Sequence, residues 1–224
     1  MRIYYINELV ARAVAEHLKE SIRGLELVVL DYSEHNPPDR FEIDEEPAVL
    51  LWGNGSMHQV SYAFRPNKPY SKVVYDAHDD FTTYDDELNC CNHNTALVFN
   101  DDNLRKIEVL GSNVPMDYGP SVLKADDRIR RVSTLDSRMV GEDLHVSFDL
   151  DVIRDFPSNP LYSKGEYILD QVAQSFSEIL ENNRVIRVDI GGLFTTRPRS
   201  FAKGAEAYSR ILEMCRELCK NRFF

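Results

Sequence analysis

Residues 72–80 read KVVYDAHDD, a short apolar run that ends in acidic side chains and one histidine. Side chains two residues apart in an extended chain point the same way, so Asp76 and His78 face one direction. Asp80 joins them if the chain stays nearly extended. The segment therefore predicts a buried strand whose carboxyl end presents a group of candidate metal ligands.

A second apolar run ends in the same way. Leu144–Asp149 reads LHVSFD, and Asp151 follows at the spacing that aligns it with Asp149. Ligand sites of parallel sheets lie outside the carboxyl ends of the strands, so two such ends side by side predict one acidic pocket. Carboxylates packed this closely raise one another's pKa values, and divalent cations remove the conflict. The alternative is that each motif is a loop or capping element.

The rest of the chain alternates between short apolar runs and helical patterns. Runs such as Glu26–Asp31 and Ala48–Trp52 are apolar on both faces, which is typical of strands buried between helices in a parallel sheet. Amphipathic helices are predicted after the N-cap Asn7, after a capping box at Ser163 and Glu166, and near the C-terminus. The fold class is therefore α/β with a mainly parallel sheet. The eight predicted strands are Arg2–Ile6, Glu26–Asp31, Ala48–Trp52, Lys72–Asp76, Thr95–Phe99, Arg105–Leu110, Leu144–Asp149 and Val185–Ile190.

Length and composition narrow the function classes. The 224 residues suit one domain over residues 1–224. Lys and Arg number 26 against 37 Asp and Glu, a formal net charge of −11, so we expect no nucleic-acid partner. There is no apolar run of 18 residues and no apolar core typical of a secretory signal, so no membrane association is expected. The four cysteines form no disulfide framework, which favours a cytoplasmic location.

Four features of the sequence resemble one enzyme superfamily. VYDAHDD at 74–80 resembles the D-A-H-x-D signature of the arginase, agmatinase and formiminoglutamase (ureohydrolase) superfamily, and HVSFDLD at 145–151 is similar to its S-F-D-x-D signature. His58 stands in a glycine-containing turn where the family has a further histidine ligand. His93 lies thirteen residues after Asp80, as a family histidine does. The resemblance implies a three-layer α/β/α fold around an eight-stranded sheet.

The resemblance also implies a centre with two divalent metal ions. Its ligands would be His58, Asp76, Asp80 and Asp149 for one ion, and Asp76, His78, Asp149 and Asp151 for the other. Carboxylate and imidazole ligands without thiolate suit Mn, Zn, Fe or Co, and the carboxylate excess favours Mn²⁺. A water bridging two cations becomes a nucleophile near neutral pH, with Asp80 orienting it. His93 is a candidate acid/base group, and the alternative is a surface histidine in a polar loop.

One position departs from the family pattern. The last predicted strand ends in Asp189-Ile190-Gly191-Gly192, and Gly192 stands where the family places a glutamate that binds a guanidinium group. A guanidinium fork needs a matching carboxylate. The sequence therefore favours a substrate other than arginine or agmatine, in a pocket with extra room at Gly192.

Two functions remain open at this point. The first is a hydrolase that cleaves a non-peptide C–N bond of a small molecule, namely a guanidine, amidine or amide. The second is a non-catalytic relative that keeps the fold and the metal as a binding or interaction protein. A deacetylase-type enzyme with a single zinc ion is a third alternative, which the paired Asp149 and Asp151 fit less well. Relatives are often homo-oligomers, so self-association is possible.

Overall fold

The structure is a computed structural model that describes residues 1–33, 38–44, 46–83, 88–113, 123, 125–158 and 165–221. Its strands are β1 (Arg2–Ile6), β2 (Glu26–Leu30), β3 (Ala48–Gly53), β4 (Tyr70–Tyr75), β5 (Leu104–Leu110), β6 (Ile129–Val132), β7 (Asp143–Asp149) and β8 (Arg184–Gly191). They form one eight-stranded sheet in the order β2-β1-β3-β8-β7-β4-β5-β6. Every pair of neighbouring strands is parallel.

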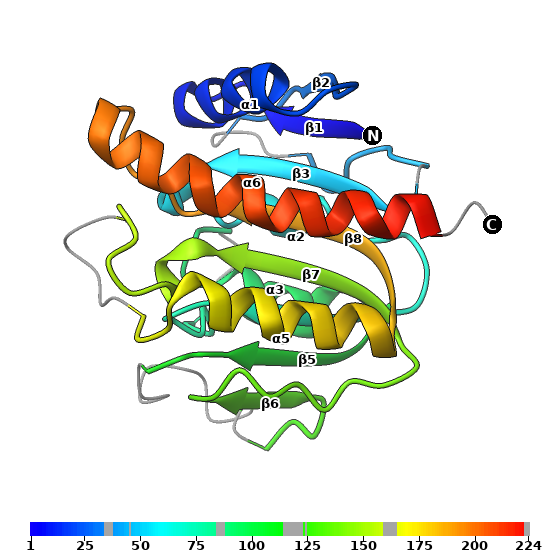
Figure 1. Cartoon of the computed structure of the whole chain (residues 1–224). Coiled ribbons are helices and arrows are strands. Elements are labelled where there is room, and N and C mark those ends of the chain that lie inside the picture. Colours follow the sequence, from blue (N-terminus) through cyan, green and yellow to red (C-terminus); the bar gives the residue numbers. More distant parts are fainter. Residues whose placement is uncertain are drawn as a thin grey trace.

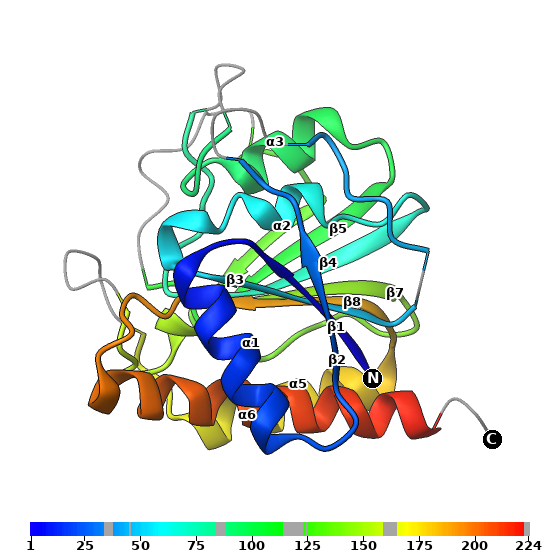
Figure 2. The same ribbon diagram turned by 90° about the horizontal axis from the view of Figure 1, so that it is seen from above.

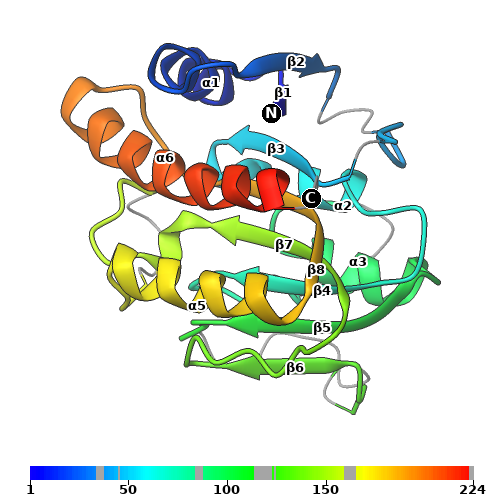
Figure 3. The same cartoon turned by 45° about the vertical axis from the view of Figure 1, so that its right-hand side comes forward.

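Helices cover both faces of this sheet. The described helices are α1 (Leu9–Ser21), α2 (Val60–Ala63), α3 (His93–Asn100), α5 (Leu169–Asn182) and α6 (Pro198–Asn221). Two 3₁₀ turns, η1 (Gly55–Met57) and η2 (Leu150–Val152), follow β3 and β7. Helices α1, α5 and α6 lie on one face, and α2 and α3 lie on the other (Figures 1 and 2). Figure 3 shows α5 and α6 in front of the sheet, running along the direction of the strands. The predicted three-layer α/β/α fold is confirmed.

Two element predictions were wrong, although the number of strands agreed. Thr95–Phe99 belongs to α3 rather than to a strand. A run of four apolar residues after a threonine has no decisive periodicity, and three of them, Ala96, Leu97 and Val98, pack on β4 and β5 as part of a helix. Strand β6, with the sequence IRRV, was not predicted because it is an edge strand whose side chains are all half-buried.

The predicted helix starts also changed. The N-cap of α1 is Glu8 rather than Asn7, because the Glu8 carboxylate accepts hydrogen bonds from the N–H groups of Val10 and Ala11 at 2.9 Å. Helix α5 begins at Leu169, later than the predicted capping box, and Ser163 lies outside the described residues. The apolar faces of both helices are buried as expected.

The central strands position the candidate site. β3 and β4 are buried at every residue, and β7 and β8 are buried beyond their first residues. These four strands are neighbours in the sheet, so their carboxyl ends meet at one place. A parallel sheet covered on both faces binds ligands at this end, which is where the two acidic motifs fall.

Candidate metal centre

The register between β4 and β7 aligns the two acidic motifs. Tyr75 of β4 pairs with Phe148 of β7, and their rings stack with centroids 4.6 Å apart. Asp76 and Asp149 are the next residues in the chain, and both are buried. Asp76 and Asp149 therefore lie at equivalent positions just beyond the carboxyl ends of the two strands.

Local hydrogen bonds shape each motif. Asp76 Oδ1 accepts from the N–H of His78 at 2.7 Å, and Asp149 Oδ1 accepts from the N–H of Asp151 at 3.1 Å. An aspartate that bonds its own backbone two residues on makes a tight turn. The Ala77 N–H also donates to Asp151 Oδ1 at 3.1 Å, which ties one motif to the other.

Asp80 and His58 reach the cluster through special backbone conformations. From the sequence, Asp80 joins the pair if the chain stays nearly extended. The chain instead turns at Asp80, with a left-handed φ of 50°. This turn leaves Asp80 Oδ2 only 2.9 Å from His58 Nδ1. Gly53 has a φ of +74°, and a Cβ there would lie 2.5 Å from the Ala11 nitrogen. A glycine at the end of β3 thus lets the chain turn toward η1 and His58.

The two imidazoles flank Asp76. His58 Nδ1 lies 3.4 Å from Asp76 Oδ2 and 3.9 Å from Asp149 Oδ2. His78 Nδ1 lies 3.4 Å from the other oxygen, Asp76 Oδ1, and 3.0 Å from Asp151 Oδ2. One carboxylate oxygen of Asp76 therefore faces each histidine, as expected of a residue that bridges two cations.

All the predicted site residues fall into three overlapping groups. Within each group the possible ligand atoms lie within 4.8 Å of one another. The groups are His58, Asp76 and Asp149; Asp76, His78 and Asp151; and His58, Asp80 and His93. The sequence analysis predicts a catalytic role for His93, not a ligand role. The position of His93 beside His58 is compatible with both roles.

The electrostatics fit a cation. Burial and then the neighbouring carboxylates raise the pKa of Asp149 well above its usual value and that of Asp151 to about 6. Burial and the charge of Asp76 raise the pKa of Asp80 to about 8. Asp76 Oδ2 and His58 Nδ1 are buried without a hydrogen-bond partner. Such crowded, partly unsatisfied ligand atoms are the donor set that a hard or borderline divalent ion accepts.

His93 is a buried residue at the start of α3. Its Nδ1 lies 3.1 Å from the carbonyl oxygen of Cys90 and 3.4 Å from Asp80 Oδ2, and its ring centroid lies 4.2 Å from that of His58. The alternative of a surface histidine is therefore wrong. Burial, and then the positive charges of His58 and Lys72, keep the pKa of His93 well below 6.5. The imidazole is neutral at physiological pH.

A buried aspartate behind the cluster was not predicted from the sequence. Asp189 of β8 is fully buried and is surrounded by four side-chain donors. Its carboxylate accepts from Trp52 Nε1 at 2.8 Å, from Ser61 Oγ at 2.8 Å and from Ser147 Oγ at 2.7 Å, and lies 2.5 Å from His145 Nε2. Asp189 is thus fully occupied and cannot replace a substrate-binding carboxylate.

This aspartate is linked to the first imidazole. Ser147 Oγ lies 3.0 Å from His58 Nε2. The Ser147 hydroxyl donates its proton to Asp189, so it accepts from His58 Nε2. Without a cation, Asp76 and Asp80 raise the pKa of His58 well above its usual value despite its burial. When the ring is neutral, as a metal ligand must be, its proton is on Nε2 and the Nδ1 lone pair faces the carboxylates. The signal in the sequence was that Ser147 and Asp149 share one strand face.

Gly192 packs against one of the central carboxylates. Its φ is +105°, and a Cβ added there would lie 2.3 Å from Asp149 Oδ1 and 2.9 Å from the Leu150 nitrogen. The position is closed rather than roomy, which corrects the expectation of extra space. A glutamate at residue 192 cannot be accommodated unless Asp149 moves.

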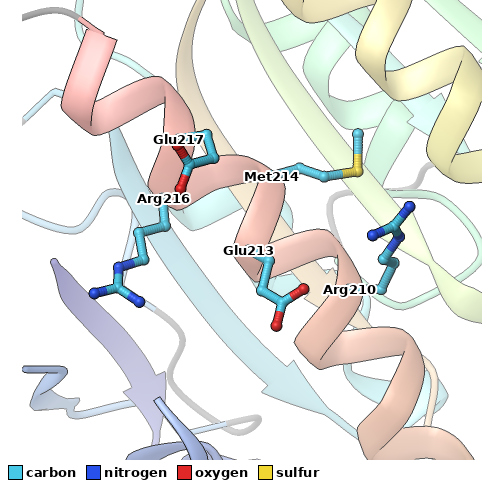
Figure 4. A pocket seen from close by; sticks show the side chains of 5 residues that line it. All are labelled: Arg210, Glu213, Met214, Arg216 and Glu217. Atoms are coloured by element: carbon cyan, nitrogen blue, oxygen red, sulfur yellow. The ribbon is translucent and has the colours of Figure 1, made fainter. Parts of the chain in front are cut away.

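A separate hollow lies on the outside of the molecule. It has a volume of about 390 Å³ and is lined by Arg210, Glu213, Met214, Arg216 and Glu217. All five residues come from α6, and none belongs to the acidic cluster (Figure 4).

Among the described residues, no helix is long and apolar enough to cross a membrane.

Comparisons with known proteins support the fold class. No family model and no curated protein matches this chain. Solved structures do match. Arginase from Medicago truncatula superimposes with a TM-score of 0.68 and 12% identity, over 94% of this chain and 84% of that one. Proclavaminate amidino hydrolase from Streptomyces clavuligerus gives 0.67 and 12%, over 94% and 89%.

A third neighbour, formimidoylglutamase from Bacillus subtilis, gives a TM-score of 0.62 and 11% identity, over 95% of this chain and 86% of that one. The chain therefore has the fold of the ureohydrolase superfamily, and aspartate and histidine groups able to hold metal lie at the carboxyl ends of its strands.

Proposed function

We propose that this chain is a metal-dependent hydrolase of a non-peptide C–N bond in an amide or amidine. The observation that carries the proposal is the orientation of His58. Its Nε2 bonds Ser147, and its Nδ1 is buried among carboxylates, 2.9 Å from Asp80 Oδ2 and 3.4 Å from Asp76 Oδ2, without hydrogen-bonding geometry to either. A histidine fixed from behind with its free nitrogen among carboxylates is the usual arrangement of a metal ligand. The solved neighbours named as arginase, amidino hydrolase and formimidoylglutamase support this reaction class.

Two Mn²⁺ ions are the proposed cofactors. Four residues would hold the first ion, and four, including the shared Asp76 and Asp149, would hold the second. The two sets are His58, Asp76, Asp80 and Asp149, and Asp76, His78, Asp149 and Asp151. Two such ions supply a hydroxide nucleophile at neutral pH and polarise the carbon that it attacks.

The chain's own side chains provide the proton chemistry. The Asp80 oxygen that faces His58 would accept a hydrogen bond from the nucleophile and thereby orient it. His93 Nδ1 faces the Cys90 carbonyl oxygen at 3.1 Å, so this nitrogen carries the proton of the neutral ring. Its Nε2 is buried without a hydrogen-bond partner and is the nitrogen that would receive a proton and deliver it to the departing amine. Because burial keeps His93 neutral, it holds the proton only briefly, as suits a shuttle.

The substrate proposal follows from the missing carboxylate. Gly192 leaves no space for one, and Asp189 is occupied by its four donors. Glu142 is engaged with Ser71 and Lys106 before β7 begins, at the opposite end of that strand. Because none of these three described positions offers a carboxylate to a guanidinium group, a neutral amide or an amidine is favoured. The same observation also favours the second candidate, a non-catalytic protein that binds metal.

Turnover tests this proposal. The Mn²⁺-loaded chain is incubated with a panel of amides and amidines and with arginine and agmatine, and released ammonia, amine and urea are measured. We expect release from at least one amide or amidine, and little urea from arginine or agmatine. Asp149→Ala should abolish the release, whereas Asp170→Ala, an exposed position on α5, should not. Mn²⁺ binding without any release supports the non-catalytic candidate instead.

A further inference from the structure

Arg131, near the end of β6, has a buried guanidinium group without hydrogen bonds. Its side chain is 9% exposed, and its Cζ lies 4.1 Å from the centroid of the Phe81 ring. Nε lies 3.4 Å from Asp79 Oδ2, without hydrogen-bonding geometry. Nε, Nη1 and Nη2 are all buried without a hydrogen-bond partner.

This arrangement is costly for a structural arginine. A buried donor that makes no hydrogen bond loses its hydration without compensation, and the loss is larger for a charged group. The neighbouring Arg130 shows the usual solution, because its Nη1 donates to Glu108 Oε1 and to the Asp136 carbonyl at 2.9 Å. Asp79 faces only the Nε edge of Arg131. Among the residues that the structure describes, the outer edge of the guanidinium fork therefore has no acceptor.

The group lies beside the candidate metal centre. Asp79 stands between His78 and Asp80, and consecutive Cα atoms are only about 3.8 Å apart. The order β4-β5-β6 places Arg131 two strands from the first acidic motif, close to the carboxyl ends. A molecule whose reacting carbon sits at the acidic cluster can therefore extend a short aliphatic chain toward Arg131.

We propose that Arg131 binds a carboxylate of the substrate, so that the hydrolysed amide or amidine is part of an acid. This inference rests on the proposed function and adds a substrate class to it. The two outer nitrogens of a guanidinium match a carboxylate in a bidentate fork, and the Phe81 ring holds the plane of that fork. A monoanionic carboxylate suits the site better than a dianionic phosphate, because Asp79 and the acidic cluster repel the second charge.

The alternative role is structural, with Arg131 serving only to neutralise Asp79. Arg131 Nε pairs with Asp79 Oδ2 at 3.4 Å in either role, so Arg131→Gln should lower stability in both cases. Only a ligand-binding role makes the affinity for a carboxylate depend on the guanidinium group, so ligand titration separates the two roles.

Binding of glutarate, a five-carbon dicarboxylate, is the direct test. Isothermal titration of the full chain with Mn²⁺ should show binding that weakens at least tenfold in Arg131→Gln. Arg131→Lys should fall between the two, because it keeps the charge and loses the fork. Arg105→Gln, which removes an exposed charge from β5, is the matched control and should bind like wild type. Inorganic phosphate should bind more weakly than glutarate.

Further outcomes distinguish a failure of the inference about Arg131 from a failure of the proposed function. Equal glutarate affinity of wild type and Arg131→Gln overturns the inference, and so does phosphate binding that is tighter than glutarate binding and is lost in Arg131→Gln. If Arg131→Gln does not fold, Arg131→Gln with Asp79→Asn, which removes both charges, replaces it in the titration. Glutarate binding that depends on Arg131 in protein unable to bind Mn²⁺ overturns the proposed function and the substrate class with it, and leaves Arg131 as a carboxylate-binding residue.

Discussion

The hydroxyl oxygen of Ser147 lies 3.0 Å from Nε2 of His58, on the side of the imidazole that faces away from the carboxylates. The Ser147 hydroxyl uses its one hydrogen to donate a hydrogen bond to Asp189, so toward the histidine it can only accept. This contact decides which nitrogen of His58 is free. It also joins the acidic cluster to the buried Asp189 of β8.

Ser147→Ala removes that acceptor. We expect Mn²⁺ affinity to fall about 10-fold to 100-fold, because partners that orient a ligating histidine have effects of this size. Ser61→Ala is the matched control, since the Ser61 hydroxyl donates to the same Asp189 and contacts Ser147, whereas only its backbone N–H, which the substitution keeps, bonds His58. Calorimetric titration with Mn²⁺ compares the two. Equal affinity in both variants would mean that the serine does not orient the ring.

Metal binding should stabilise the fold. The carboxylates of the cluster repel one another unless a cation binds, and a ligand that binds only the folded state stabilises it by mass action. At 100 times the dissociation constant the gain is about 2.7 kcal/mol, or roughly 5–10 °C in Tm for a chain of this size. A chelator should lower Tm by this amount, and Mn²⁺ should restore it. A melting curve indifferent to both contradicts the metal centre.

The pH dependence of the metal-free protein follows from raised pKa values. Asp80 at about 8 and Asp151 at about 6 both lie above the ordinary 3.8, so the folded state binds more protons than the unfolded state. Their contribution to stability is present below about pH 4 and is lost as the pH rises to 8. His78, raised to about 12 by Asp151 and Asp76 despite its burial, acts in the same direction above pH 6.5.

Mn²⁺ should reverse this trend, because the ligands must be deprotonated before they bind. We expect the increase in Tm caused by Mn²⁺ to be larger at pH 8 than at pH 6. Thermal melts with chelator and with Mn²⁺ at both pH values provide the measurement. An increase that shrinks between pH 6 and pH 8 would count against these carboxylates as ligands.

Gly192→Ala tests the close approach to Asp149. The φ of +105° alone costs about 1 kcal/mol or more for a residue with a Cβ. Gly141→Ala is the control, because its φ is +72° and nothing lies within 4 Å of a Cβ there. Both variants should lose stability in chemical denaturation, but only Gly192→Ala should also lose Mn²⁺ affinity. Unchanged Mn²⁺ affinity in Gly192→Ala would show that Asp149 can move aside.

Much of the site could be predicted because its geometry is local. Asp76 with His78, and Asp149 with Asp151, lie two residues apart at strand ends, so the extended backbone alone aligns each pair. The turn at Asp80 could not be predicted, since its left-handed φ depends on the contacts around His58.

Features that depend on distant residues were missed. Asp189 and His145 meet across 44 residues of sequence, and only the pairing of β7 with β8 brings them together. The edge strand β6 has too few apolar residues to be recognised from its pattern. The apolar pattern of Thr95–Phe99 fits a strand and a helix equally well. Only the packing of this segment on β4 and β5 decides that it is a helix.

Titration with Mn²⁺, with the bound metal counted per chain, tests the binuclear centre most directly. Wild type should bind two ions, and Asp151→Ala, which removes a ligand of one ion only, should bind about one tightly. Asp149→Ala removes a shared carboxylate and should lose tight binding at both positions. Two tightly bound ions per chain in Asp149→Ala, or none in the wild type, would contradict the centre that the cluster of His58, Asp76 and Asp149 predicts.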